Sequence, residues 1–500
     1  MEAVVTGRAH RILALNTIAF TVCFACWMLN GVLVTFLAGN QVFDWGPVEI
    51  GWLLGIPVLT GSIFRLPAGI LTDKFGGRPV FGILLLFCAI PMFLLSQAYS
   101  FFSFALCSFG FGLTGVGFAV GIAFTSVWYP KNWQGTALGI FGAGNAGAAI
   151  TTLLAPTLLN NLTNHGEDIE KWRTLPIIYA AALVLMGIVF LLFTKNKKPQ
   201  SNAKTLRKML QPLKSVRVWR FGLYYFLVFG CFVAFSQWLV PYFTNVYYLP
   251  LVTAGIFASV FSLPSGLIRA IGGWMSDRFG GRKIMLWVLV SSLVICFLLI
   301  VPKMEVHSPG KGINARVSGT VTEVTETSVK IGSINYELNQ KSGKMDKMET
   351  DILIFPTKEV WQEPVVKVGD KVVKNQLIVK GKTIIYFQAN VWIFVGLVFL
   401  IGSIWGIGKA AVYRLIPDYF PNEVGVVGGM VGVIGGLGGF VCPIIFGYLL
   451  EGTGLWTSCW MFMFFLSAIC LLWFYNVVQK INRKDNPIPN VTIDTQKKVS

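Results

Sequence analysis

The chain has 500 residues, of which 54% are hydrophobic and only 13% are charged, and its mean hydropathy is +0.66. Soluble globular proteins of this length are not so apolar, so the composition excludes that class and indicates an integral membrane protein. The formal net charge of +18 comes from basic residues at the ends of apolar segments, without a nucleic-acid-reading motif, which excludes binding to nucleic acid.

Twelve apolar segments are long enough to cross a bilayer as helices. They cover residues 11–37, 47–71, 79–98, 101–129, 135–161, 174–194, 219–247, 251–275, 284–302, 389–413, 424–450 and 456–478. The predicted fold class is an all-α membrane protein whose twelve transmembrane helices form two six-helix halves, with a small β-rich insert.

The predicted domains follow these segments. They are an N-terminal half at 1–194, a basic linker at 195–218, helices 7–9 at 219–303, the insert at 304–388, helices 10–12 at 389–479 and a tail at 480–500. Lysine and arginine gather in the linker and in the loops on its side. The positive-inside rule therefore places the linker, the tail and both termini on the cytoplasmic side of the cell membrane, and the insert on the opposite side.

The insert alternates apolar and polar residues at 316–324 and 365–379, which is typical of short β-strands. Residues 368–377 resemble a half-barrel of the biotinyl/lipoyl type, and Met345–Thr350 resembles a biotin-attachment turn that Asp346 interrupts. We expect an unmodified accessory domain without a cofactor. The three histidines are scattered, so no metal site is predicted.

A nine-residue frame occurs once in each half. It runs from Arg65 to Asp73 and from Arg269 to Asp277, with a glycine midway, so its key residues share one helix face. An arginine at mid-membrane depth costs about 2.5–3.5 kcal/mol to insert. No Asp or Glu lies near mid-depth in the twelve segments to pair with it. A planar guanidinium fork suits a planar oxyanion such as nitrate or nitrite, so the pair predicts an anion site.

Two predicted helices are rich in glycine, at Gly139–Gly147 and Gly425–Gly439. Small residues allow close helix packing. They also allow a helix to slide or bend and expose its backbone to a small ligand.

These features together resemble the nitrate/nitrite porter family of the major facilitator superfamily. The resemblance implies one set of substrate-binding residues: Arg65, Arg269, Asn145, Tyr225, Phe24, Phe118, Phe229, Gly142, Gly144 and Gly435. Two of these, Phe24 and Phe118, taken singly, are as compatible with lipid or core packing. The cytoplasmic loop that follows each nine-residue frame implies gating by Asp73, Arg78, Asp277 and Arg282.

Lys409 departs from the family pattern, which has a Gly-Asn-Gly-type element in this helix. Two interpretations stay open. The side chain extends to the cytoplasmic face, or it is a third cation on the anion path with a possible role in coupling.

The sequence thus predicts transport rather than catalysis. The predicted function is alternating-access movement of nitrate and nitrite, by exchange of one for the other. The alternatives are proton-coupled nitrate symport, a carrier of small carboxylates such as oxalate or formate, and a membrane receptor that uses the outer β domain. The predicted partners are nitrate, nitrite and the lipid bilayer, and the predicted state is a monomer.

Overall fold

The computed structural model describes residues 7–198, 211–300, 304–341, 357–387, 390–420 and 424–485. The chain forms two compact units. One is helical and comprises Met1–Leu298 with Leu397–Ser500, and the other, Leu299–Gly396, is rich in β-structure. Residues 342–356, which include the segment that resembles a biotin-attachment turn, lie outside the described residues.

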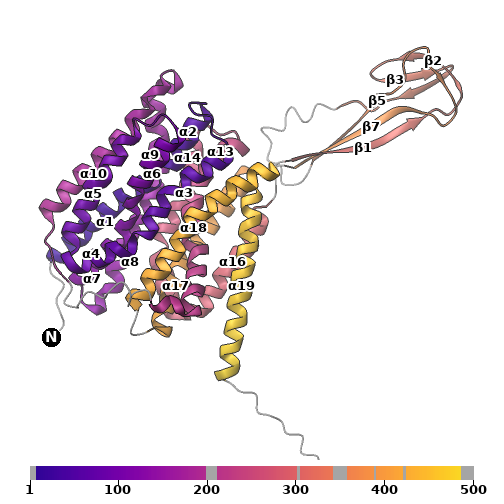
Figure 1. Ribbon diagram of the computed structural model, residues 1–500. Coiled ribbons are helices and arrows are strands. Elements are labelled where there is room, and N and C mark those ends of the chain that lie inside the picture. Colours follow the sequence, from indigo (N-terminus) through magenta and orange to yellow (C-terminus); the bar gives the residue numbers. More distant parts are fainter. Residues whose placement is uncertain are drawn as a thin grey trace, which may run out of the picture. The chain divides into compact units, whose positions relative to one another are not determined.

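The N-terminal half of the helical unit is drawn in indigo to magenta (Figure 1). Its α-helices are α1 (Gly7–Trp27), α2 (Asn30–Gly39), α3 (Pro47–Ile63), α4 (Arg65–Phe75), α5 (Gly77–Leu95), α6 (Phe101–Phe111), α7 (Gly117–Trp128), α8 (Lys131–Gly142), α9 (Gly147–Leu162) and α10 (Thr174–Phe193).

The C-terminal half follows after the linker. Its α-helices are α12 (Val216–Tyr225), α13 (Cys231–Val246), α14 (Leu251–Leu267), α15 (Arg269–Phe279), α16 (Gly281–Leu298), α17 (Val391–Tyr419), α18 (Val424–Thr453) and α19 (Ser458–Asp485). Short 3₁₀ segments at Asn164–Gly166, Ile169–Arg173 and Gln211–Lys214 connect helices.

Eleven continuous helical stretches within the described residues are long and apolar enough to span a membrane. A twelfth span results if α14 and α15, which are bent by 44° at their junction, are counted together. The predicted fold class, a mostly helical membrane protein with a small β-rich region, is confirmed.

The outer helices are apolar on both faces. On α5, buried and exposed side chains alternate with helical periodicity: the buried face carries Phe81, Leu85, Cys88 and Met92, and the exposed face Ile83, Phe87, Ile90 and Leu94. A helix that exposes large apolar side chains along its whole length is stable against lipid rather than water. The stretch Val216–Val246 is by contrast 89% buried over its apolar window and lies inside the bundle.

Three spans leave α-geometry for one turn. A 3₁₀ turn, η1 (Gly112–Val116), joins α6 to α7, and a second, η2 (Ala143–Ala146), joins α8 to α9. The turn η6 (Phe226–Gly230), between α12 and α13, is π-helical. Such turns shift the direction of the side chains around them and are frequent at functional sites.

The two halves contact each other through glycines. Helix α3 packs along α18 (Figure 1), and α9 packs against α14. A Cβ atom on Gly51 would lie 2.5 Å from the Pro443 carbonyl oxygen, and one on Gly55 would lie 2.7 Å from that of Phe440. Toward the other end of the same spans, a Cβ on Gly69 would meet no atom within 4 Å. The halves are therefore packed tightly at the end where α3 begins, whereas the Cβ position of Gly69 in α4 has no close neighbour.

The β-rich unit contains two small antiparallel sheets. Its strands are β1 (Met304–Asn314), β2 (Gly319–Val324), β3 (Ser328–Ile331), β4 (Ile334–Glu337), β5 (Thr357–Pro364), β6 (Lys371–Val372) and β7 (Leu377–Phe387). The sheet orders are β1-β7-β5 and β4-β3-β2-β6. Alternate residues such as Val321, Val329 and Ile331 point into a shared apolar core.

A cross-strand ion pair joins β5 to β7. The Lys382 ammonium lies 2.6 Å from a Glu363 carboxylate oxygen, and the Trp361 indole N–H donates a hydrogen bond to the other oxygen at 3.0 Å. This ammonium, through its hydrogen bond, holds the pKa of the Glu363 carboxyl below its ordinary value.

Candidate functional site

The two repeated arginines occupy equivalent places in the helical unit. In the first half α3 ends at Ile63 and α4 begins at Arg65, and in the second half α14 ends at Leu267 and α15 begins at Arg269. Each arginine is thus the first residue of a half-helix that follows a break. The sequence repeat corresponds to a structural repeat, with one guanidinium contributed by each half.

Arg65 is almost completely buried, with 4% of its surface exposed. Its Nη1 donates a hydrogen bond to the Gly432 carbonyl at 2.9 Å, whereas its Nε and Nη2 have no hydrogen-bond partner among the described residues. Its guanidinium carbon lies 5.4–5.6 Å from three ring centroids, those of Trp27, Phe118 and Phe229. Aromatic faces stabilise the cation in part, and two donor groups remain available to a ligand.

Arg269 contacts the same aromatic ring. Its guanidinium carbon lies 5.5 Å from the Phe118 centroid, the same distance as that of Arg65, so the two charges are no more than twice that distance apart. It also lies 5.7 Å from the Tyr413 centroid. Its Nη1 is buried without a hydrogen-bond partner in the described part of the chain. Both arginines therefore present unused donors around Phe118.

Each arginine lies against a glycine of the opposite half. A Cβ on Gly142, at the end of α8, would lie 3.7 Å from Arg269 Cδ and 3.8 Å from its Nη1. A Cβ on Gly436, in α18, would lie 3.3 Å from Arg65 Nη1. Because these positions carry no side chain, the guanidinium from one half can reach the backbone of the other.

Tyr225 and Phe229 form one wall of the site around the π-helical turn. Their rings stack at 4.9 Å with an angle of 11° between the planes. Gly435 packs directly against the Tyr225 ring, which a side chain at that position would displace. Tyr413 lies 5.0 Å from Tyr225 and donates a hydrogen bond from Oη to the Gly428 carbonyl at 3.1 Å. The π turn thus brings two residues at i and i+4 into a stacked pair beside Arg65.

Asn145 is fully buried on the 3₁₀ turn η2. Neither its amide nitrogen nor its amide oxygen has a hydrogen-bond partner among the described residues. A buried amide without a partner costs about 1–3 kcal/mol. Its backbone lies beside α14, where a Cβ on Gly266 would be 3.6 Å from the Asn145 carbonyl carbon, and Gly144 packs against Phe20. Asn145 therefore offers a further donor close to the start of α15.

Phe24, which the resemblance implies as a site residue, packs against other aromatic residues of α1. Its ring contacts Phe20 at 5.6 Å and Trp27 at 5.4 Å. Among the described residues, the rings that lie over Arg65 are those of Trp27, Phe118 and Phe229. Trp27, three residues further along α1, therefore contacts this guanidinium and Phe24 does not.

Two further residues that contact the arginines, Trp27 and Tyr413, were not predicted from the sequence. Trp27 is an aromatic residue in an apolar helix and gives no signal in the sequence. Tyr413 follows Lys409 by four residues and so shares its helix face, a signal that could have been used.

Lys409 is fully buried, so it does not extend to the cytoplasmic face. Its Nζ donates a hydrogen bond to Ser265 Oγ at 2.9 Å and lies 3.1 Å from the Phe232 ring centroid. Ser265 lies one helical turn before Arg269, so the ammonium is close to the candidate site. The interpretation as an extended surface lysine is wrong for this structure.

The ion pairs of the described residues involve none of the cations Arg65, Arg269 and Lys409, of which Arg65 and Lys409 are buried and Arg269 is partly buried. Arg65, Arg269 and Lys409 therefore have no carboxylate within 4.0 Å in that part of the chain. Buried charges are normally paired, so an arrangement of cations without counter-charges can hold an anion.

The four residues assigned to gating lie at the end of the helices remote from the tight glycine contacts. Asp277 accepts a hydrogen bond from Arg414 Nε at 2.6 Å. Arg78 Nε donates to the Leu191 carbonyl at 3.0 Å. Asp73 is partly buried near the end of α4, and Arg282 lies over the Tyr419 ring at 5.6 Å. The contact of Asp277 joins α15 to α17 within one half.

Comparison with known proteins gives a consistent assignment. The family model described as Major Facilitator Superfamily matches residues 15–310 and 381–497. The chain is 38% identical over 481 residues to a Thermus thermophilus protein named probable nitrate/nitrite antiporter NarK1, covering 95% of this chain and 93% of that one. It is 25% identical over 474 residues to the nitrite extrusion protein of Bacillus subtilis, covering 94% and 95%.

Among solved structures, a bacterial homologue of the human lysosomal transporter Spinster, in an inward-facing and occupied conformation, has a similar fold. The TM-score is 0.63 at 11% identity, over 95% of this chain and 97% of that one.

Proposed function

The chain belongs to the nitrate/nitrite porter family of the major facilitator superfamily, and from this premise we propose that it exchanges nitrate for nitrite across the cytoplasmic membrane. It is a multi-pass membrane transporter. The observation that carries the proposal is the pair of arginines, one from each half, which share the Phe118 ring and have no carboxylate partner among the described residues.

The chemistry of the pair suits a small planar oxyanion. Each guanidinium presents coplanar N–H donors that can bind two oxygens of one anion. The flat rings of Phe118 and Phe229, whose planes differ by 23°, border the Arg65 guanidinium. The unpartnered amide of Asn145 supplies one further donor. We therefore propose nitrate and nitrite as the substrates.

The helix breaks and glycine contacts support alternating access. Under the positive-inside rule the end where α3 begins is the outer one, so the tight contacts at Gly51 and Gly55 close the outer side. The space beside Gly69 then lies on the cytoplasmic side. On this basis we propose an inward-facing state of the cycle, with both termini cytoplasmic and residues 304–388 extracytoplasmic. We propose that the transporter acts as a monomer, because all residues of the candidate anion site come from one chain.

Exchange follows from the charge of the empty site. Two cations without an anion repel each other, and their transfer through a closed, water-poor state is costly. An anion at the site neutralises part of that charge. The loaded carrier should therefore reorient faster than the empty one, and nitrite leaving the cell would return the site for the next nitrate.

Counterflow in proteoliposomes tests the proposal. Vesicles loaded with nitrite should take up external nitrate much faster than empty vesicles, while a pH gradient alone should have little effect. Proton-coupled symport is the second candidate, favoured by the buried Lys409 near Arg269. Robust uptake driven by a pH gradient into vesicles without internal anion would reject exchange in its favour.

A further inference from the structure

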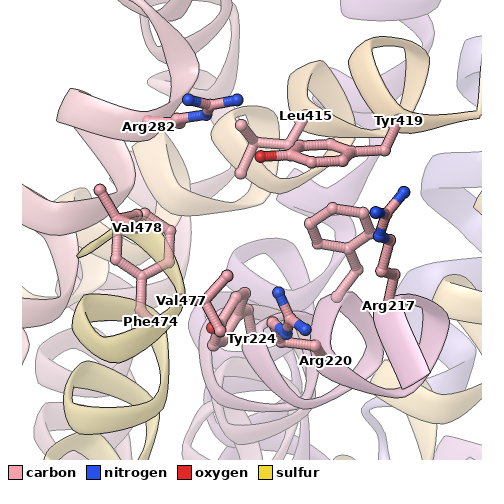
Figure 2. A pocket seen from close by; sticks show the side chains of 10 residues that line it. Arg217, Arg220, Tyr224, Arg282, Leu415, Tyr419, Phe474, Val477 and Val478 are labelled. Carbon is pink, nitrogen blue, oxygen red and sulfur yellow. The ribbon is translucent and has the colours of Figure 1, made fainter. Parts of the chain in front are cut away.

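Three arginines surround a pocket away from the candidate anion site, at the ends of four helices of the C-terminal half. Arg217 and Arg220 come from the start of α12, and Arg282 comes from the start of α16. Figure 2 shows Arg282 on one side of the Tyr419 ring and Arg217 on the other, with Arg220 on the opposite wall of the hollow. The guanidinium carbons of Arg217 and Arg282 each lie 5.6 Å from the Tyr419 centroid.

These charges have no counter-charge in the described part of the chain. No carboxylate there lies within 4.0 Å of any of the three. The nearby carboxylates of Asp277 and Asp418 are both bound to Arg414. Arg220 Nε is buried and lacks a hydrogen-bond partner among the described residues. Three like charges around one hollow repel each other, so the pocket attracts an anion.

The remaining walls of this pocket are mostly apolar, apart from the hydroxyl groups of Tyr224 and Tyr419. The apolar side chains are Phe221 of α12, Leu415 of α17 and Phe474, Val477 and Val478 of α19. A pocket for a free, fully hydrated ion has no need of such walls. An anion that is attached to hydrocarbon satisfies both parts, because its charge meets the guanidiniums and its apolar part covers the aliphatic side chains.

The position along the helices fits a membrane surface. The pocket lies where α12 and α16 begin and where α17 and α19 approach their ends, which the positive-inside rule places at the cytoplasmic surface. Basic pockets between helices on this side are able to hold anionic headgroups. All lining residues belong to the C-terminal half, so this pocket is separate from the anion site between the halves.

We propose that Arg217, Arg220 and Arg282 form a binding site for the phosphate group of an anionic phospholipid in the cytoplasmic leaflet. The bound headgroup joins α12, α16, α17 and α19. Because α12 leads directly to Tyr225 and Phe229, occupancy stabilises the half that carries one wall of the transport site. A soluble phosphate ion shares the same headgroup chemistry and is the alternative source.

The experiment measures thermal unfolding of the full-length protein in a neutral detergent. Dioctanoyl phosphatidylglycerol, dioctanoyl phosphatidylcholine and inorganic phosphate are titrated separately. We expect phosphatidylglycerol to raise the Tm saturably, with phosphatidylcholine and phosphate far less effective. Removal of each guanidinium should raise the half-saturating lipid concentration about tenfold, the loss typical of one hydrogen bond to a charged group.

The variants are Arg217→Gln, which changes an exposed residue and should fold normally, and the double variant Arg220→Gln with Arg282→Gln. The matched control is Lys283→Gln, which removes an exposed charge beside Arg282 but outside the pocket. Its lipid response should equal that of the unmodified protein.

Unchanged lipid affinity in both pocket variants, or an equal loss in Lys283→Gln, would overturn the site. Equal stabilisation by phosphatidylcholine would overturn the requirement for an anionic lipid. Equal stabilisation by inorganic phosphate, lost in the pocket variants, would overturn the lipid as the source. If the double variant does not fold, the Arg217→Gln titration decides alone.

Discussion

Replacement of Gly436 by alanine tests whether Arg65 needs a bare backbone in the opposite half. A Cβ at this position would lie 3.3 Å from Arg65 Nη1 and would overlap the hydroxyl of Ser62. The guanidinium must then move, and its 2.9 Å hydrogen bond to the Gly432 carbonyl is misaligned. Gly436→Ala is therefore expected to damage the anion site even though alanine is the better helix former.

The expected loss of nitrate affinity can be estimated from one favourable and two unfavourable effects of the substitution. Alanine gains about 1 kcal/mol over glycine in helix propensity, while overpacking of a tight contact costs about 1–3 kcal/mol. A misaligned hydrogen bond from a charged donor adds about 1.5 kcal/mol or more. The net loss is then about 1.5–3.5 kcal/mol, and if all of it falls on the anion-bound state, nitrate binding is weakened roughly 10–300-fold.

The assay combines nitrate-dependent thermal stabilisation of the purified protein with nitrate–nitrite counterflow in proteoliposomes. The matched control is Gly452→Ala, at an exposed position of the same helix where a Cβ would meet no atom within 4 Å. The control should bind nitrate normally. Near-normal nitrate affinity in Gly436→Ala would refute the reasoning, and so would an equal loss in both variants.

Three further predictions concern charge, coupling and the insert. Arg65→Lys and Arg269→Lys keep the charge but lose the planar fork, so each should weaken nitrate binding at least about tenfold by the same thermal-shift assay; near-normal uptake by either would contradict the paired-arginine site. Lys409→Met removes a buried ammonium, so nitrite-loaded vesicles should still exchange within about twofold of the unmodified rate; a loss specific to pH-driven uptake would instead assign Lys409 to proton coupling. Replacement of 306–386 by a Gly/Ser linker should leave nitrate affinity unchanged, because this region forms its own core; a folded variant that binds no nitrate would show that the insert belongs to the transport site.

The helical architecture and the family were predictable, because both depend on composition and on a nine-residue motif that occurs in the sequence of each half. Twelve apolar segments need only hydropathy, and the frame that starts at Arg65 and recurs at Arg269 marks equivalent positions in two halves. Both predictions are confirmed. That each arginine lies against a glycine of the opposite half was not predictable, since a repeat describes each half separately and says nothing of their packing.

The finer details of the site depend on features that leave no sequence signal. Phe20, Phe24 and Trp27 lie near one face of α1. Trp27 is the one that contacts Arg65, because it lies at the matching height along the helix axis. The π turn occurs in an apolar segment without proline. Lys409 could have been exposed or buried, because a long side chain reaches either place and only the packing of α14 against α17 fixes it beside Ser265.

The break before each arginine has a mechanical consequence. The half-helices α4 and α15 each carry an arginine of the proposed anion site at one end and, eight residues later, Asp73 or Asp277 toward the other. Eight residues of helix form a stiff rod about 12 Å long. If the arginine binds the anion and the carboxylate belongs to the gate, as proposed, a displacement of one end of the rod also displaces the other, so anion binding and gate movement would be coupled through a single helix.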